Sequence, residues 1–185
     1  MKNDFLILGN SVSGTSLLQS LLNHHPKVEC KFEWFKNTSK KDVEGCLDLW
    51  FEDANKHEKI WGNKIPLEQF FNAGWEDADI INLIDHFHII FIQRRFSMYA
   101  KHNSNNSAYE GWWKRANLDI YWAMREAEPE KIIAVSFEDL CLRPVIELTR
   151  ICRFLSITYN KDMMKGTANT KSRVNKPGCF DLTRV

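Results

Sequence analysis

Short, nearly continuous apolar stretches alternate along this chain with longer segments in which apolar residues recur every three or four positions. The clearest apolar stretches cover residues 5–9, 88–93 and 131–136, and residues 28–32 form a weaker one. Each has the length of a strand that is buried on both faces. The alternation predicts an α/β fold with three layers, in which helices cover a central, mostly parallel sheet.

The segments between these stretches have the spacing of amphipathic helices. A helix is expected to begin near Gly14, with four leucines on one face, and Pro26 ends it. Four more helices follow from the same pattern, and the last begins at a proline, a favoured first residue of a helix. These helices are predicted over residues 40–56, 80–87, 113–127 and 144–155. Residues 36–41 and 67–79 carry no such pattern and are expected to be loops.

Composition narrows the function classes. The length of 185 residues fits one domain, and a net charge of +1 gives no bulk attraction to a nucleic-acid polymer or a membrane surface. Any anion site must therefore be local. No apolar run is long enough to span a membrane. The five cysteines are scattered and the six histidines lack metal-ligand spacing, so we expect no metal site and a cytoplasmic location.

A glycine-bracketed loop follows the first predicted strand. Residues 9–16 read GNSVSGTS, which is a G-x-x-x-x-G frame followed by two hydroxyl residues. Such a loop can aim consecutive N–H groups at a phosphate, and the helix that follows adds its positive N-terminal end. Thr15 stands where a Walker A loop has lysine, which disfavours an ATP or GTP hydrolase of the usual design. An ordinary glycine turn before a helix is the alternative.

The segment from residue 5 to residue 26 resembles the opening of sulfotransferases that use 3′-phosphoadenosine 5′-phosphosulfate (PAPS), where the loop reads G-x-x-R-S-G-T-T-L-L and His-Pro closes the helix. Four further segments resemble that family in the same order. They are WGNKIP at 61–66, IIFIQR at 89–94, VSFEDL at 135–140 and ICRFLS at 151–156. The resemblance implies a short, divergent member with the P-loop NTPase-like sulfotransferase fold, as a single domain over residues 1–185.

The resemblance also implies roles for individual residues. Lys64 matches the lysine that steadies charge on the bridging oxygen of the phosphosulfate. Arg94 would bind the 3′-phosphate, with Arg95 as the alternative. PAPS would be the co-substrate and no metal would be needed. The phosphosulfate would be held by the backbone and hydroxyls of Ser11, Ser13, Gly14, Thr15 and Ser16.

The expected general base is a glutamate near the end of the weaker apolar stretch. Glu33 precedes two aromatic residues, as a glutamate often does in this region of the family. Its apolar neighbours could raise its pKa toward the working range of a base. Glu29 is the rival, and both could equally be solvated glutamates at a strand end.

The sequence departs from the family at two places. Val12 replaces the arginine or lysine of the loop, which removes a cation near the leaving group. The family usually has a serine eight residues after the 3′-phosphate arginine, where this chain has His102, with Ser104 two residues later. Either could contact the phosphate. A basic tail that includes Arg173 would cover the nucleotide.

These observations favour a PAPS-dependent sulfotransferase that acts on a hydroxyl or amine of a small-molecule, glycan or peptide acceptor. A small-molecule or nucleotide kinase with an atypical loop is one alternative. A sulfotransferase-like domain that binds nucleotide without catalysis is another. Glu138 and Asp139 are expected to form a structural turn bonded to the backbone, rather than a catalytic pair. The sequence does not indicate the acceptor or the oligomeric state.

Overall fold

A five-stranded parallel sheet forms the centre of the computed structural model, which describes residues 3–35, 43–97 and 108–166. The order of the strands across the sheet is β2-β3-β1-β4-β5, and every neighbouring pair is parallel. The strands are β1 (Phe5–Leu8), β2 (Val28–Phe32), β3 (Ile60–Lys64), β4 (His88–Gln93) and β5 (Ile132–Ser136). The predicted α/β class with a parallel sheet is confirmed.

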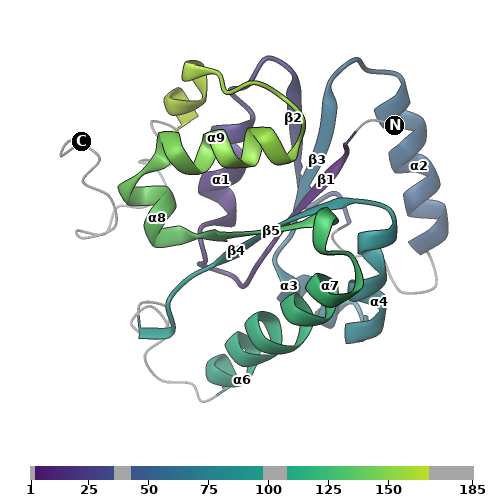
Figure 1. The fold of residues 1–185 in the computed structure, drawn as a ribbon. Helices are drawn as coiled ribbons and strands as arrows, with labels where there is room; N and C mark the ends of the chain where they lie inside the picture. Colours follow the sequence, from purple (N-terminus) through teal and green to yellow (C-terminus); the bar gives the residue numbers. More distant parts are fainter. Residues whose placement is uncertain (1–2, 36–42, 98–107, 167–185) are drawn as a thin grey trace.

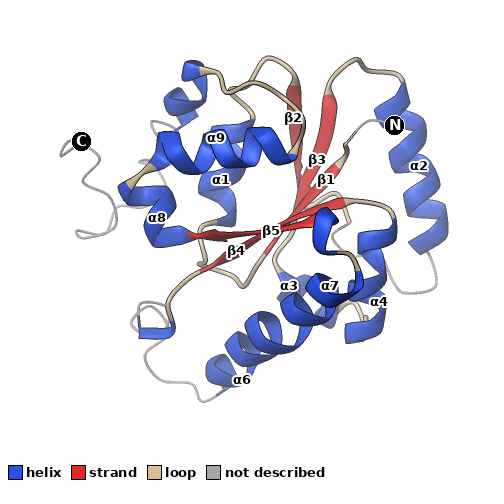
Figure 2. Cartoon of the chain, in the orientation of Figure 1, coloured by secondary structure: helices blue, strands red, loops and turns tan. Residues whose placement is uncertain are grey.

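Helices cover both faces of the sheet, which gives the predicted three layers (Figures 1 and 2). On one face lie α1 (Thr15–Leu22), α8 (Phe137–Leu142) and α9 (Pro144–Phe154). On the other face lie α2 (Val43–Asn55), α3 (Leu67–Asn72), α4 (Asp77–Ile81), α6 (Ala108–Lys114) and α7 (Tyr121–Ala127). A π-helical segment, Arg115–Ile120, joins α6 to α7, and 3₁₀ turns cover Asn82–Asp85, Pro129–Lys131 and Lys161–Lys165.

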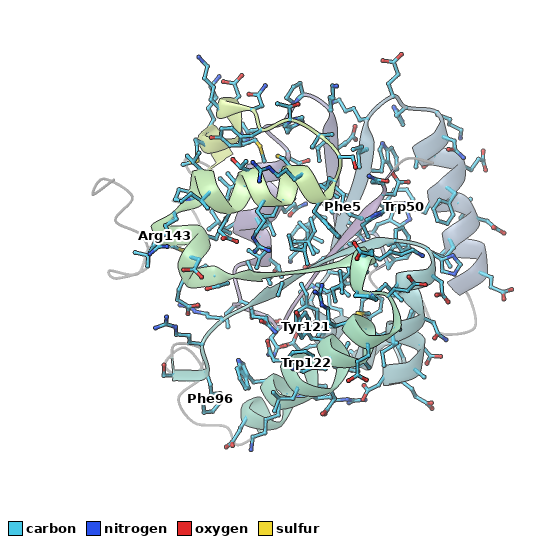
Figure 3. The ribbon with its side chains drawn as sticks, viewed as in Figure 1. Phe5, Trp50, Phe96, Tyr121, Trp122 and Arg143 are labelled. Atoms are coloured by element: carbon cyan, nitrogen blue, oxygen red, sulfur yellow. The ribbon has the colours of Figure 1, made fainter. Side chains whose placement is uncertain are left out.

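The strands send alternate side chains into two separate cores, as the two-residue period of a strand requires. Phe5 and Ile7 of β1 pack with the side of α1 and α9, whereas Leu6 and Leu8 pack with the side of α2 to α7. The second core is rich in aromatic rings around the fully buried Trp50, and Figure 3 labels Phe5 and Trp50. Burial on both faces explains why β1 is continuously apolar and why β4 and β5 are apolar between their end residues.

The structure corrects the sequence prediction between residues 60 and 81. Residues 60–64 form β3, which the sequence did not identify because the strand contains a glycine, an asparagine and a lysine. Gly62 is required there, since a side chain at that position would clash with the ring of Phe5. The expected loop at 67–79 holds α3 and the start of α4, and the expected helix at 80–87 is the end of α4 with a 3₁₀ turn.

The parallel sheet brings the ends of all five strands to one edge. The registers align Ile7 with Lys64, Phe32 with Lys64, and Gln93 with Ser136. The segments that follow the strands therefore lie next to one another, although they come from distant parts of the sequence. Ligands of open α/β sheets bind at this carboxyl edge.

Candidate functional site

The glycine-bracketed loop connects β1 to α1 at this edge. Gly14 has a φ of 97°, in the left-handed region that favours glycine, and a side chain there would clash with the ring of Phe137. The amide of Ser13 donates to the carbonyl of Asn10 at 3.1 Å, which closes the turn. Of the predicted ligands in the loop, Ser13 and Thr15 are buried and Ser16 is exposed. The loop therefore joins a strand to a helix through a glycine turn, as its sequence predicts.

The carboxylate of Glu68, in the first turn of α3, contacts this loop. The amide of Ser11 donates to both carboxylate oxygens of Glu68, at 3.0 and 2.9 Å, and its hydroxyl donates to Oε2 at 3.2 Å. Burial raises the pKa of Glu68, while the bonds from Ser11 and the charge of Lys64 oppose that shift. A predicted phosphate ligand thus has a protein carboxylate as its partner.

The predicted base and the predicted lysine are brought together. Lys64 ends β3, Glu33 follows β2, and Nζ of Lys64 lies 2.8 Å from Oε1 of Glu33. Both side chains are buried, with exposed fractions of 5% and 8%. Nζ also lies 4.4 Å from the centre of the Phe32 ring. Removing one partner of such a buried pair strongly destabilises the folded chain, because the other charge stays buried without compensation.

Gln69 of α3 holds the second oxygen of the base. Its Nε2 donates to Oε2 of Glu33 at 2.6 Å. The backbone around Glu33 is fixed as well, since its amide donates to the carbonyl of Lys64 at 2.8 Å and the amide of Trp34 donates to Oδ1 of Asn63 at 2.9 Å. Glu33 has a φ of 52°, a strained conformation for a residue other than glycine. Such strain is often found at functional sites, where the surroundings stabilise it.

Glu29, the rival base, lies in a different environment. It forms an ion pair with Lys31 on the same strand, and about a third of each side chain is exposed, 34% and 32% respectively. The hydrogen bond from Lys31 lowers the pKa of Glu29, which makes it a weaker base. Glu33 has a lysine partner as well, and it differs from Glu29 in that only 8% of its side chain is exposed.

Arg94 follows β4 and is buried, with an exposed fraction of 5%. Its Nη1 donates to the carbonyl of Val12 at 2.8 Å, and its guanidinium lies 4.5 Å from the centre of the Phe137 ring. The side chain of Arg95 is exposed instead. Neighbouring residues at a strand end point in opposite directions, and here Arg94 points to the loop.

Two side chains bond to the backbone at Arg94 and Arg95, and the sequence did not identify either of them for this role. Nε1 of Trp113 donates to the carbonyl of Arg94 at 2.8 Å, and Glu138 accepts from the amide of Arg95 at 3.1 Å. Glu138 thus bonds to the backbone, as predicted, within the short helix α8 rather than a simple turn. Trp113 lies on α6, 19 residues after Arg94 in the sequence.

Gln69 and Glu68 were also missed, because they lie in the segment that carried no recognisable pattern. Pro66 gave a signal for a helix start, since proline often precedes or begins a helix. The side-chain partners of α3 could not follow from that signal. They depend on β3 lying between β2 and β1, which the sequence does not show.

Three predicted ligands, His102, Ser104 and Arg173, lie outside the described residues. Within 3–35, 43–97 and 108–166, no cluster of three or more metal-binding side chains occurs. No helix in those ranges is long and apolar enough to cross a membrane.

The chain is similar in fold to several solved sulfotransferases. The sulfotransferase domain of an olefin synthase from Synechococcus PCC 7002 is 17% identical, with a TM-score of 0.69 over 96% of this chain and 82% of that one. A sulfotransferase from Alicyclobacillus acidocaldarius is 17% identical, with a TM-score of 0.57 over 94% and 92%. A mouse sulfotransferase complexed with PAP is 16% identical, with a TM-score of 0.51 over 92% and 65%. At these identities the likeness shows the fold.

The sequence gives a second, independent match. Residues 71–161 match the model of a sulfotransferase family, whereas no curated protein matches the chain. The matched range includes Arg94 and the VSFEDL segment but leaves out the loop, Glu33 and Lys64. Of the five segments that carry the motif resemblance, the loop and WGNKIP lie outside the matched range, and the other three lie within it. Together with the fold, they show that the chain is similar to the sulfotransferase family, with the family match covering residues 71–161.

Proposed function

We propose that this chain transfers a sulfuryl group from PAPS to a hydroxyl or amine acceptor, with Glu33 as general base and Lys64 as the cation at the leaving group. The observation that carries the proposal is the buried contact of 2.8 Å between Glu33 and Lys64. The pair lies at the carboxyl edge of the sheet, beside the phosphate loop. A base and a cation are the two groups that sulfuryl transfer asks of the protein.

The proposed step makes one bond to sulfur and breaks another. The acceptor oxygen or nitrogen bonds to sulfur while the bond from sulfur to the bridging oxygen breaks. The acceptor proton passes to Glu33, and the electron pair of the broken bond stays on the bridging oxygen, where Lys64 offsets its charge. The second product is 3′-phosphoadenosine 5′-phosphate (PAP).

The donor is proposed to lie between the loop and Arg94. Amides and hydroxyls of the loop, with the N-terminus of α1, would hold the phosphosulfate. Arg94 would bind the 3′-phosphate, and His102 or Ser104 would add a contact there. Arg173 would cover the nucleotide. The solved mouse relative, which is complexed with PAP, supports a donor of this class.

The chain would act as a single domain in the cytoplasm on a small-molecule, glycan or peptide acceptor, without a metal. A kinase is less well supported, because Thr15 stands in place of the loop lysine. A non-catalytic nucleotide-binding domain is favoured by the absent serine and by Val12, which is 47% exposed and brings no charge to the loop, and it is opposed by the presence of Lys64 and Arg94.

Thermal unfolding with PAP, ATP or buffer tests the donor, because a ligand that binds the folded chain raises its melting temperature. We expect PAP to stabilise the chain and ATP to have little effect. Stabilisation by ATP alone would favour a kinase. Transfer is then measured with labelled PAPS and a panel of phenolic, sugar and peptide acceptors.

A pair of variants tests the base. Glu33→Gln should retain PAP binding and lose at least about a hundredfold in transfer, because an amide cannot take up the proton. The matched variant Glu29→Gln should keep most of the activity. The opposite ranking would assign the base to Glu29. PAP binding without transfer by the unmodified chain to any acceptor in the panel would favour the non-catalytic domain.

A further inference from the structure

The contact between Glu68 and Ser11 places a protein anion in the loop that is proposed to bind the donor. Both carboxylate oxygens of Glu68 accept from the amide of Ser11, at 3.0 and 2.9 Å. We infer that Glu68 is an internal anion of the phosphate loop, which the donor displaces and which selects against donors with a more highly charged terminal group. The inference deepens the proposed function and rests on it for the identity of the donor.

The backbone holds Glu68 beside the loop. The amide of Ile65 donates to the carbonyl of Ile7 at 3.1 Å, and the amide of Leu67 donates to the carbonyl of Gly9 at 3.0 Å. These bonds continue the pairing of β3 with β1 past the ends of both strands. The next residue along the chain is Glu68, so the carboxylate faces the loop because the two strands are in register.

The chemistry of the contact is that of a bound oxyanion. A carboxylate presents two oxygens to the amide of Ser11, as a sulfate or phosphate group would. The hydroxyl of Ser11 donates to the same carboxylate at 3.2 Å. The donors that Ser11 can offer to a phosphosulfate are thus directed to Glu68 in this structure.

The charges of the site point the same way. Among the described residues of the site, the positive charges of Lys64 and Arg94 are matched by the negative charges of Glu33 and Glu68. Lys64 acts on Glu68 directly, since its charge lowers the pKa of that carboxyl. With Val12 in the loop, the site has no net positive charge on these residues. Glu68 therefore repels each additional negative charge on a ligand, and these four residues offer no net positive charge to offset that repulsion.

This repulsion distinguishes two kinds of donor. The terminal sulfuryl group of a phosphosulfate carries one negative charge. A terminal phosphate carries nearly two at neutral pH, because its second pKa is about 6. A carboxylate next to the terminal group therefore opposes a nucleoside triphosphate more than it opposes PAPS. Specificity of this kind comes from repulsion of the wrong ligand rather than from attraction of the right one.

Calorimetric titration of the unmodified chain and the variant Glu68→Gln tests the inference, with pyrophosphate, PAPS and ATP as probes. Glutamine keeps the shape and an acceptor oxygen for Ser11 but removes the charge. We expect Glu68→Gln to bind pyrophosphate and PAPS about tenfold more tightly, and to gain more for ATP than for PAPS. Glu126→Gln, which removes an exposed carboxylate on α7, should change none of the three affinities.

The outcomes separate this inference from the proposed function. If Glu68→Gln bound pyrophosphate equally or more weakly, the role of Glu68 as an internal anion would be overturned. If its affinity for ATP rose no more than its affinity for PAPS, the proposed selection between donors would be overturned. Tighter pyrophosphate binding with no binding of PAPS by either chain would support Glu68 and contradict the proposed donor. If the variant does not fold, the NMR resonance of the Ser11 amide in the unmodified chain tests whether a ligand displaces Glu68. It should shift when pyrophosphate displaces Glu68, and an unchanged resonance would refute the displacement.

Discussion

The base side and the donor side of this site are held by different kinds of contact. On the base side, Glu33 contacts Lys64 and Gln69 through side-chain atoms, at 2.8 and 2.6 Å. On the donor side, Arg94 contacts a backbone carbonyl and an aromatic ring, and Ser11 contacts Glu68 at an exposed position. The base side is therefore preformed, whereas the donor side has partners that a ligand can replace.

The comparison predicts that stability depends mostly on the base side. Replacing Lys64 by methionine leaves Glu33 buried without a cation, and we expect a loss of about 3–5 kcal/mol in the free energy of unfolding. Urea unfolding at pH 7 measures it. Lys31→Met is the control, since its pair with Glu29 is about one third exposed and should be worth about 1 kcal/mol or less. Equal losses in the two variants would mean that the base side is not preformed.

Ligand binding should depend mostly on the donor side. Replacing Arg94 by alanine removes the buried cation proposed for the 3′-phosphate, and PAP binding should weaken by about 2–4 kcal/mol. Calorimetric titration with PAP measures it. Arg95→Ala is the matched control, because the Arg95 side chain is exposed and should contribute little. If Arg95→Ala weakened PAP binding more than Arg94→Ala, the two arginines would have to exchange roles.

A smaller change should separate the two sides within one helix. Replacing Gln69 by leucine removes the donor to Oε2 of Glu33, and the free energy of unfolding should fall by about 1–2 kcal/mol. The affinity for PAP should stay the same, since Gln69 contacts the base and not the loop. Asn72→Leu, at an exposed position of the same helix, should change neither quantity. A large loss of PAP affinity in Gln69→Leu would show that the two sides are coupled through α3.

The smallest effect concerns the pH dependence of stability. Burial raises the pKa of Glu68 in the folded chain above its ordinary value of 4.5. Between 4.5 and the raised pKa, the folded chain therefore holds more protons than the unfolded chain. Stability should therefore fall as pH rises through this window. The fall should be absent in Glu68→Gln. Urea unfolding of both chains between pH 4 and pH 7 checks this, and parallel curves would contradict it.

The sequence was sufficient for the parts of the fold that depend on local pattern. β1 is apolar along its whole length, β4 and β5 are apolar except at His88, Gln93 and Ser136 at their ends, and α9 begins at Pro144 as predicted. β3 was missed because its burial comes from both neighbouring strands rather than from its own composition. Asn63 shows this, since it is fully buried and yet polar.

Part of the candidate site could be placed from predicted strand ends. The loop follows β1 and Arg94 follows β4, whereas Lys64 ends β3, which the sequence analysis missed. The contacts of Glu68 and Gln69 could not be predicted, because they depend on the order of the strands and on a helix in a segment without a pattern. The sequence already shows that Val12 leaves the loop without a cation. The structure adds the carboxylate of Glu68, which makes the loop less positive still.

One feature of the sheet bears on how the chain avoids self-association. Among the described strands β2 lies at the edge of the sheet, where an added strand could pair with it, although the amide and the carbonyl of Cys30 are already bonded to the side chain of Asn23. Glu29 and Lys31 place a charged pair on that strand, which disfavours such pairing. An added strand would run alongside the residues that lead to Glu33. The charges that disfavour an added strand on β2 would therefore also prevent aggregation from distorting the backbone next to Glu33.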